Sequence, residues 1–149
     1  MDNIYAALRL EDLVPDKKIY TSGEEVTFSY KLTNFSGERL VVPENNNYSP
    51  ALYLVGIVQT WVERLGSDNN IPNFSYGDLR DGSRYGSGGE VIDIVRSLDK
   101  REIESGESIP LRRQLVTKGL PPGRYRYSID YETFDGQIIQ TLTVDIEIR

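Results

Sequence analysis

The 149-residue chain contains neither cysteine nor histidine. The absence of cysteine excludes disulfide bonds, thiolate zinc sites, iron–sulfur clusters and thiol nucleophiles. The absence of histidine excludes the Ser-His-Asp arrangement, imidazole-ligated metal sites and the most frequent general base of enzymes. Only carboxylate, lysine or tyrosine chemistry remains for catalysis. The sequence therefore predicts a protein that is not an enzyme and that has no cofactor and no metal site.

The chain also lacks a long apolar run and a basic, apolar N-terminal segment. Its longest apolar stretch, from Leu52 to Val58, is far too short to cross a bilayer. Asp2, Glu11 and Asp12 stand near the N-terminus, where a signal peptide has a basic start and an apolar run. We therefore expect no membrane insertion. The chain as written is expected to be cytoplasmic, and extracytoplasmic if a leader has been removed.

Positive charge is scarce, with 17 lysines and arginines against 23 aspartates and glutamates and a net charge of −6. Binding to the phosphates of a nucleic acid needs a concentrated positive surface, so we expect no nucleic-acid partner. The hydrophobic share of 38% and the charged share of 27% are ordinary for a folded soluble protein. A chain of this length fits a single domain, 1–149.

The strongest pattern in the sequence is an alternation of apolar and polar residues near the C-terminus. Apolar residues occupy every second position from Tyr125 to Tyr131 and again from Leu142 to Ile148. This period of two is typical of strands that bury one face. The dipeptide Asp135-Gly136 lies between the two runs and favours a two-residue turn of the primed type. The pattern therefore predicts an antiparallel hairpin.

Shorter runs of the same kind predict further strands along the chain. Their ranges are 6–10, 26–33, 40–42, 51–65 and 109–116, with Gly56 as a candidate bulge in the fourth. The range 91–95 fits a short strand or two helical turns, and we favour the strand. Some seven to nine short strands with frequent turn signals predict an all-β fold, an immunoglobulin-like antiparallel β-sandwich.

Three segments carry a resemblance to known proteins. The run from Tyr20 to Asn34 contains a Gly-Glu turn that enters a strand ending in Thr-Asn, and it resembles the opening of many bacterial immunoglobulin-like domains. The segments 103–108 and 120–125 resemble the later half of the same pattern. The chain is similar, over about two-thirds of its length, to the intracellular proteinase inhibitor (BsuPI-like) family of Bacillus-type proteins. That resemblance implies a β-sandwich and, as an alternative function, a cytoplasmic protease inhibitor.

The segment from Gly66 to Glu90 does not follow the strand pattern, and we predict that it is a long loop. It is rich in the glycine, tyrosine, serine, asparagine and arginine that binding loops favour. Long loops in compact domains tend to be functional or disordered, so a plain surface loop is an equally weighted alternative. The candidate partner-binding residues are Phe74, Tyr76, Arg80, Arg84 and Tyr85, together with Tyr48 from the segment 44–50.

The leading hypothesis from these patterns is a non-catalytic protein-binding or assembly module. Its partner would be another protein or the subunits of an assembly, further copies of this chain included. A third hypothesis is a carbohydrate-binding module, in which Tyr48, Tyr76, Tyr85 or Trp61 stacks on a sugar ring. The position of Trp61 beside Val62 favours a core or inter-sheet residue over a sugar-stacking one.

Two weaker patterns occur in the same region. The run Gly86-Ser87-Gly88-Gly89 is similar to Gly-rich loops that bind phosphate, but neither a lysine nor a following helix accompanies it, so we expect a flexible turn. Several oxygen-bearing residues could supply ligands to calcium, although their spacing is not that of an EF-hand and such residues are common in turns. They are Asp68, Asn69, Asn70, Asp78 and Asp81.

Overall fold

The computed structural model describes residues 4–44, 53–65, 84–93, 98–118, 120–133 and 135–149, with the backbone alone described for Leu54 and for residues 84–93. The elements in chain order are α1 (Ile4–Ala7), β1 (Leu8–Pro15), β2 (Ile19–Tyr20), β3 (Glu25–Asn34), β4 (Leu40–Val41), β5 (Leu54–Leu65), β6 (Arg84–Asp93), β7 (Glu102–Ile103), β8 (Ser108–Val116), β9 (Gly123–Glu132) and β10 (Ile138–Ile148). The expected all-β fold is confirmed. The strand count exceeds the predicted seven to nine because β2, β4 and β7 are separate two-residue strands.

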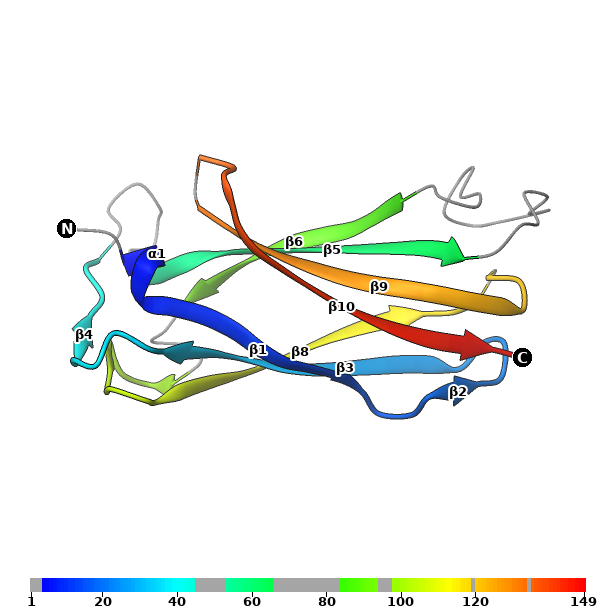
Figure 1. Ribbon diagram of the computed structural model, residues 1–149, viewed down its shortest axis with the longest axis horizontal. Helices are drawn as coiled ribbons and strands as arrows, with labels where there is room; N and C mark the ends of the chain where they lie inside the picture. The colour runs from blue at the N-terminus through cyan, green and yellow to red at the C-terminus, as the bar shows by residue number, and fades with distance from the viewer. Residues whose placement is uncertain (1–3, 45–52, 66–83, 94–97, 119, 134) are drawn as a thin grey trace.

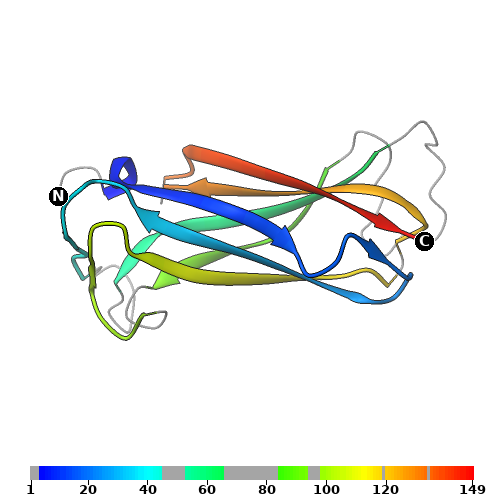
Figure 2. The ribbon, with the colours of Figure 1, turned by 60° about the horizontal axis from the view of Figure 1, so that its bottom comes forward.

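The long strands form two sheets that pack face to face (Figures 1 and 2). One sheet has the order β1-β3-β8 and the other the order β2-β10-β9-β5-β6, while β4 and β7 form a small separate pair. In Figure 2 the red β10 and orange β9 lie in the upper layer, above the blue β1 and light-blue β3. This is the immunoglobulin-like arrangement, with β1, β3 and β8 in the A, B and E positions and β5, β6, β9 and β10 in the C, C′, F and G positions.

The core lies between the two sheets and follows the predicted period of two. Strand β9 contributes four hydrophobic side chains that are fully buried, and β3 contributes four hydrophobic side chains that are at most 5% exposed. Each such aliphatic side chain stabilises the fold by roughly 1.5–3 kcal/mol relative to an exposed one. These residues are Tyr125, Tyr127, Ile129 and Tyr131 on β9, and Val26, Phe28, Tyr30 and Leu32 on β3.

The predicted C-terminal hairpin is present, with Tyr125 paired to Ile146, but its turn is longer than the two residues that Asp135-Gly136 predicts. The Thr133 amide donates to the Gln137 carbonyl over 2.9 Å and the Gly136 amide donates to the Thr133 carbonyl over 3.1 Å. Gly136 has a φ of +89°. These features describe a three-residue connection whose last position is a left-handed glycine, so the two-residue prediction is wrong.

Two details near strand ends also differ from or refine the prediction. The chain forms one helical turn, α1, before β1 begins at Leu8, because Ile4 and Ala7 are three residues apart and both are buried. The register of β5 against β6 shifts between Leu54 and Ile57, which confirms a bulge at Gly56. Within the ranges that the structure describes, no helix reaches the length and apolar character of a membrane span.

Candidate functional site

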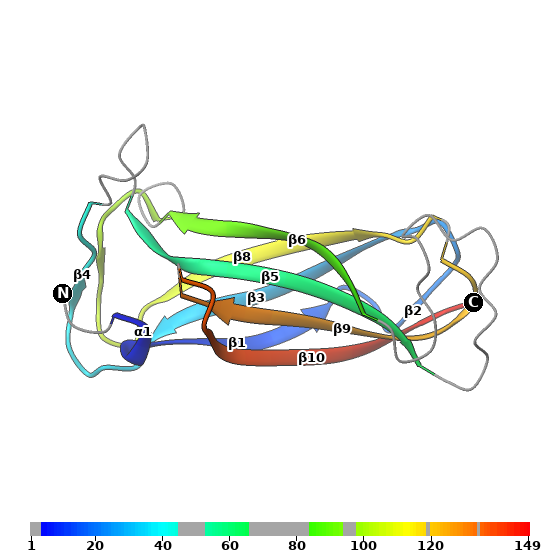
Figure 3. The ribbon, with the colours of Figure 1, turned by 90° about the horizontal axis from the view of Figure 1, so that it is seen from above.

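Strands β5 and β6 flank the segment that the sequence identifies as the candidate binding region. Strand β5 lies between β9 and β6 in the five-stranded sheet, and its pairing with β6 ends at Glu63 and Arg84 (Figure 3). The chain leaves β5 at Leu65 and enters β6 at Arg84, near the end of the sandwich that holds the C-terminus (Figure 1). The segment 66–83 therefore connects the ends of two hydrogen-bonded strands. We call this end of the sandwich the C-terminal end.

The connection from β8 to β9 is held to the C-terminal end of strand β5. The Tyr125 hydroxyl donates to the Pro121 carbonyl over 2.6 Å, which is the tyrosine corner of immunoglobulin-like folds. The Arg64 guanidinium donates to the Pro122 carbonyl over 3.1 Å. It lies so close to Gly123 that a Cβ there would be 3.0 Å from the Arg64 Nε. The end of β5 is thereby fixed to a rigid corner.

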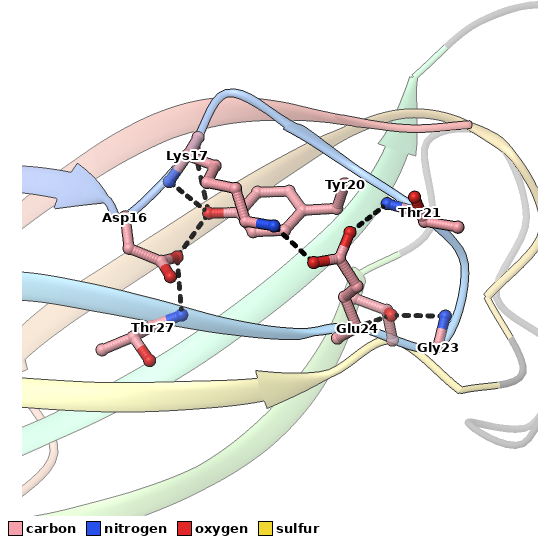
Figure 4. Close-up of polar contacts among 8 residues, drawn as sticks. Asp16, Lys17, Tyr20, Thr21, Gly23, Glu24 and Thr27 are labelled. Carbon is pink, nitrogen blue, oxygen red and sulfur yellow. Dashed lines mark hydrogen bonds and ion pairs between the residues drawn. The ribbon is translucent and has the colours of Figure 1, made fainter.

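A second polar network holds the turn between β2 and β3 at the same end (Figure 4). The Tyr20 ring is buried, and its hydroxyl donates to the Asp16 carboxylate over 2.6 Å while accepting from the Lys17 amide over 2.7 Å. Asp16 also accepts from the Thr27 amide over 3.1 Å. This network fastens the chain where it crosses from the three-stranded sheet to the five-stranded one.

Glu24 completes the turn from the other side. Its carboxylate accepts from the Thr21 amide over 2.6 Å and forms an ion pair with Lys17. The Gly23 amide donates to the Thr117 hydroxyl over 3.0 Å, and this hydroxyl donates to the Glu24 carbonyl. The Gly-Glu turn that was recognised in the sequence is thus bound to the residue that follows β8.

The ionisation states of this network are those of a structural site. The hydrogen bond from Tyr20 holds the pKa of Asp16 below its ordinary value. Burial, and next the hydrogen bond to Asp16, raise the pKa of Tyr20. The interaction with Lys17, and next the Thr21 amide, lower the pKa of Glu24. Acid–base catalysis needs a group whose pKa lies near the working pH, and these shifts move each group away from neutrality.

The structure describes some of the candidate partner-binding residues and not others. Phe74, Tyr76, Arg80 and Tyr48 lie outside the described residues, as do the candidate calcium ligands from 68 to 81. Arg84 and Tyr85 lie at the start of β6, opposite Glu63 and Val62 of β5. Among the residues that the structure describes, no group of three or more acidic side chains is arranged to hold a metal ion.

The predicted loop from Gly66 to Glu90 is too long at its C-terminal end. Residues 84–90 belong to β6, so the Gly-Ser-Gly-Gly run is part of a strand and the expected flexible turn is wrong. Gly88 pairs with Thr60 and Gly86 with Trp61, and the register shifts between these pairs. Glycine has a low strand propensity, but the backbone hydrogen bonds to a long central strand outweigh it at the edge of a sheet. The strand reading of 91–95 holds as far as Asp93.

The segments that contain Tyr48 and Tyr76 attach to opposite ends of β5. Residues 45–52 precede Tyr53 and Leu54, whereas residues 66–83 follow Leu65. With about 3.3 Å per residue, the two ends of this strand are roughly 36 Å apart. The two segments therefore leave the sheet at points that are separated by the length of β5.

Trp61 does not lie in the core, contrary to the expectation from its neighbour Val62. Val58, Thr60 and Val62 are buried between the sheets, so Trp61 belongs to the outward face of β5, where it is half-buried. Its indole N–H donates to the Asp130 carboxylate over 2.8 Å, and the Thr141 hydroxyl donates to the same carboxylate over 2.6 Å. The alternation of buried residues in β5 was the signal that could have placed Trp61 outward.

Comparisons with known proteins identify the fold and no more. No family model matches the chain, and no curated protein matches it. Many solved structures resemble it, including the following three. Alkylpurine DNA glycosylase AlkC of Pseudomonas fluorescens, bound to DNA containing an abasic site analog, has 11% identity and a TM-score of 0.53 over 96% of this chain and 30% of that one. A Paenibacillus sp. cycloisomaltooligosaccharide glucanotransferase has 14% identity and a TM-score of 0.53 over 93% and 14%. A β-glucosidase of Listeria innocua has 10% identity and a TM-score of 0.51 over 95% and 15%.

The chain spans less than a third of each of these proteins. Identities this low establish the shared sandwich and leave activity, substrate and partner open. The resemblance to the intracellular proteinase inhibitor family stays a prediction, which an inhibition assay against serine and cysteine proteases would test.

Proposed function

We propose that this chain is a non-catalytic module that binds another protein, or joins subunits of an assembly, through the segment 66–83. The observation that carries the proposal is the pairing of β5 with β6 up to Glu63 and Arg84. It anchors both ends of a segment rich in glycine, serine, asparagine and aspartate, which also carries Phe74, Tyr76 and Arg80, on adjacent strands. Binding residues are often found on connections that a rigid scaffold positions.

The surroundings of this anchor support a binding role over a catalytic one. Arg64 and Tyr125 hold the neighbouring corner, and the pKa shifts of Asp16 and Glu24 keep both carboxylates ionised at neutral pH. The whole sequence has no cysteine and no histidine, which removes the thiol nucleophile and the most frequent general base. The paired strands and the fixed corner therefore form a rigid support from which a contact segment extends.

A loop-replacement variant tests this function. Residues 67–82 are replaced by a short Gly-Ser linker, which leaves β5 and β6 intact because they end at Leu65 and begin at Arg84. The matched control keeps the full length and the same composition of 67–82 in scrambled order. Tagged parent, replacement and control proteins are used to isolate partners from cells that make the parent chain.

We expect the parent to retain a specific partner, or a second copy of itself, and both variants to lose it. In urea unfolding, the free energy of unfolding of each variant should match that of the parent to within about 0.5 kcal/mol, the usual effect of a surface change. A partner that binds the replacement variant as tightly as the parent would show that another surface makes the contact.

Carbohydrate binding is a second candidate, favoured by the outward position of Trp61. An indole ring on a sheet face offers a flat apolar surface next to polar groups, here Gln59 on the same face of β5 and the exposed Thr143 of β10. A glycan array probed with the parent and with Trp61→Ala tests it. Glycan signal that disappears in the variant supports the candidate, and an array without signal from the parent rejects it.

A further inference from the structure

A cavity of about 350 Å³ lies between α1, the start of β1 and the β9–β10 hairpin. It belongs to the end of the sandwich opposite to the C-terminus, away from the end of β5 at Leu65 and the start of β6 at Arg84 (Figure 1). Its volume is within the range of sites that hold small organic molecules. The described residues that line it are Tyr5, Ala6, Arg9, Thr133, Gln137 and Ile139.

The N-terminal wall of this cavity is held in place by hydrogen bonds and ring packing. The Arg9 Nη1 donates to the Tyr5 carbonyl over 3.0 Å and to the Leu8 carbonyl over 2.8 Å. The Tyr5 ring packs at an angle of 58° against the buried Tyr131 ring, with 6.1 Å between centroids. The guanidinium and the phenol ring are thus positioned before any ligand arrives.

The opposite wall is equally fixed. The Thr133 amide donates to the Gln137 carbonyl over 2.9 Å, and the Gln137 amide donates to the Thr133 hydroxyl over 3.1 Å. Next to Ile139, the Gln140 side chain bonds to both the amide and the carbonyl of Leu10, each over 2.8 Å. This pair of hydrogen bonds joins β10 to β1 across the sheets. A preformed cavity lowers the ordering cost of binding.

The chemistry of the lining selects one kind of ligand. Arg9 is the one ionised side chain among the described lining residues, although the chain as a whole has a net charge of −6. Ala6, Ile139 and the Tyr5 ring are apolar, and the exposed Gln137 side chain carries an amide, whereas the Thr133 hydroxyl already donates to the Asp135 carboxylate. A single guanidinium matches the one charge and planar geometry of a carboxylate better than the higher charge of a phosphate.

We propose that this cavity binds a small organic carboxylate, with the carboxylate on Arg9 and an apolar body against Tyr5, Ala6 and Ile139. The carboxylate is that of a free aromatic acid or of the C-terminus of a peptide chain. Both sources present the same pair of groups to the cavity. We call the cavity the Arg9 pocket.

Titration of the ¹⁵N-labelled full chain by NMR tests the Arg9 pocket. The probes are phenylacetate and N-acetylphenylalanine, each compared with its neutral amide. We expect the acids to shift amide resonances in the ranges 5–9 and 133–139, and the amides to bind at least about tenfold more weakly, because a charge-assisted hydrogen bond is lost. Tighter binding of phenylacetate indicates a free aromatic acid, and tighter binding of N-acetylphenylalanine indicates a chain terminus.

Three variants separate binding from folding. Arg9→Met should weaken the acids by about tenfold or more, whereas Arg112→Met, which alters a cation beside a different cavity, on β3 and β8, should leave binding unchanged. Gln137→Glu places a negative charge at the exposed rim and should weaken the acids even if Arg9→Met disturbs α1. The proposal is overturned if the amides bind as tightly as the acids, if Gln137→Glu binds like the parent, or if no acid shifts these resonances at millimolar concentration.

Discussion

Phe28 of β3 and Tyr127 of β9 stack face to face between the two sheets, with 3.7 Å between ring centroids and 6° between ring planes. Tyr127 stands two residues after the corner tyrosine, Tyr125. In antibody domains this position of the F strand carries the second cysteine of the disulfide that joins strands B and F. In a chain without cysteine, an aromatic pair therefore occupies the place of that covalent link.

The stacked pair should contribute to stability beyond the burial of each ring. In a double-mutant cycle of Phe28→Leu and Tyr127→Leu, we expect a coupling free energy of about 0.5–1.5 kcal/mol. Urea unfolding of the four proteins measures it. The control Phe35→Leu, at a position that is 59% exposed, should change the free energy of unfolding by less than about 0.5 kcal/mol. Additive effects at Phe28 and Tyr127 would show that the stack adds nothing specific.

Gly56 should be the least replaceable glycine among those that the structure describes. Its φ is +140°, and a Cβ at this position would overlap the Tyr131 ring, whose hydroxyl bonds to the Val55 carbonyl. Backbone strain and overpacking together predict that Gly56→Ala lowers the free energy of unfolding by about 2–4 kcal/mol. Gly37 has a φ of +82° but open space around it, so Gly37→Ala should cost only about 1 kcal/mol. Equal costs for the two variants would contradict the clash with Tyr131.

The network around Asp16 should make stability depend on acidic pH. The pKa of Asp16 is lowered in the folded state, so its contribution is fully present above the ordinary pKa of an aspartate and is lost as the pH falls through the lower, folded value. Asp16→Asn should therefore flatten the loss of stability at acidic pH, and Tyr20→Phe should do so in part. Urea midpoints between pH 2.5 and 7 measure the effect. A parent-like pH profile in Asp16→Asn would contradict this assignment.

The chain has one tryptophan, so Trp61 fluorescence reports directly on Asp130. Asp130 is 3% exposed and accepts from both Trp61 and Thr141. Asp130→Ala should shift the emission of Trp61 and lower the free energy of unfolding by about 1.5–3 kcal/mol, since two donors lose a charged acceptor. Asp145→Ala removes a more exposed carboxylate that pairs with Arg126, and it should cost less than about 1 kcal/mol. An unchanged emission spectrum in Asp130→Ala would place the indole elsewhere.

Most of the sandwich could be predicted from the sequence because strand burial repeats with a period of two. The buried apolar residues of β3 and β9 are those that the alternation selected, and β10 follows the same rule at Ile146 and Ile148. Features that depend on how strands meet could not be predicted in this way. The register of β5 against β6 makes a strand of a glycine-rich run that reads locally as a turn, and the Thr133 hydroxyl stabilises a longer hairpin connection than Asp135-Gly136 predicts.

The two candidate sites also differ in how far they could be predicted from the sequence. A loop from Gly66 to Glu90 was predicted from composition, and the end of β5 at Leu65 and the start of β6 at Arg84 narrow it to the segment 66–83. The Arg9 pocket had no sequence signal, because Arg9, Thr133 and Ile139 come together only when β1 meets the β9–β10 hairpin. The alternation of β9 assigns its polar residues to the outward face, yet Asp130 is buried there, since it accepts a hydrogen bond from Trp61 diagonally across neighbouring strands.

Site-specific photo-crosslinking tests most directly whether the segment 66–83 makes the contact with a partner. The photoreactive residue p-benzoylphenylalanine is placed at Tyr76, at Tyr53 near the opposite end of β5, or at the exposed Thr143 of β10, and cells that make each variant are irradiated. We predict a crosslinked species of defined mass from the Tyr76 variant and none from the other two. Crosslinks from Tyr53 or Thr143 without any from Tyr76 would contradict the proposed contact surface.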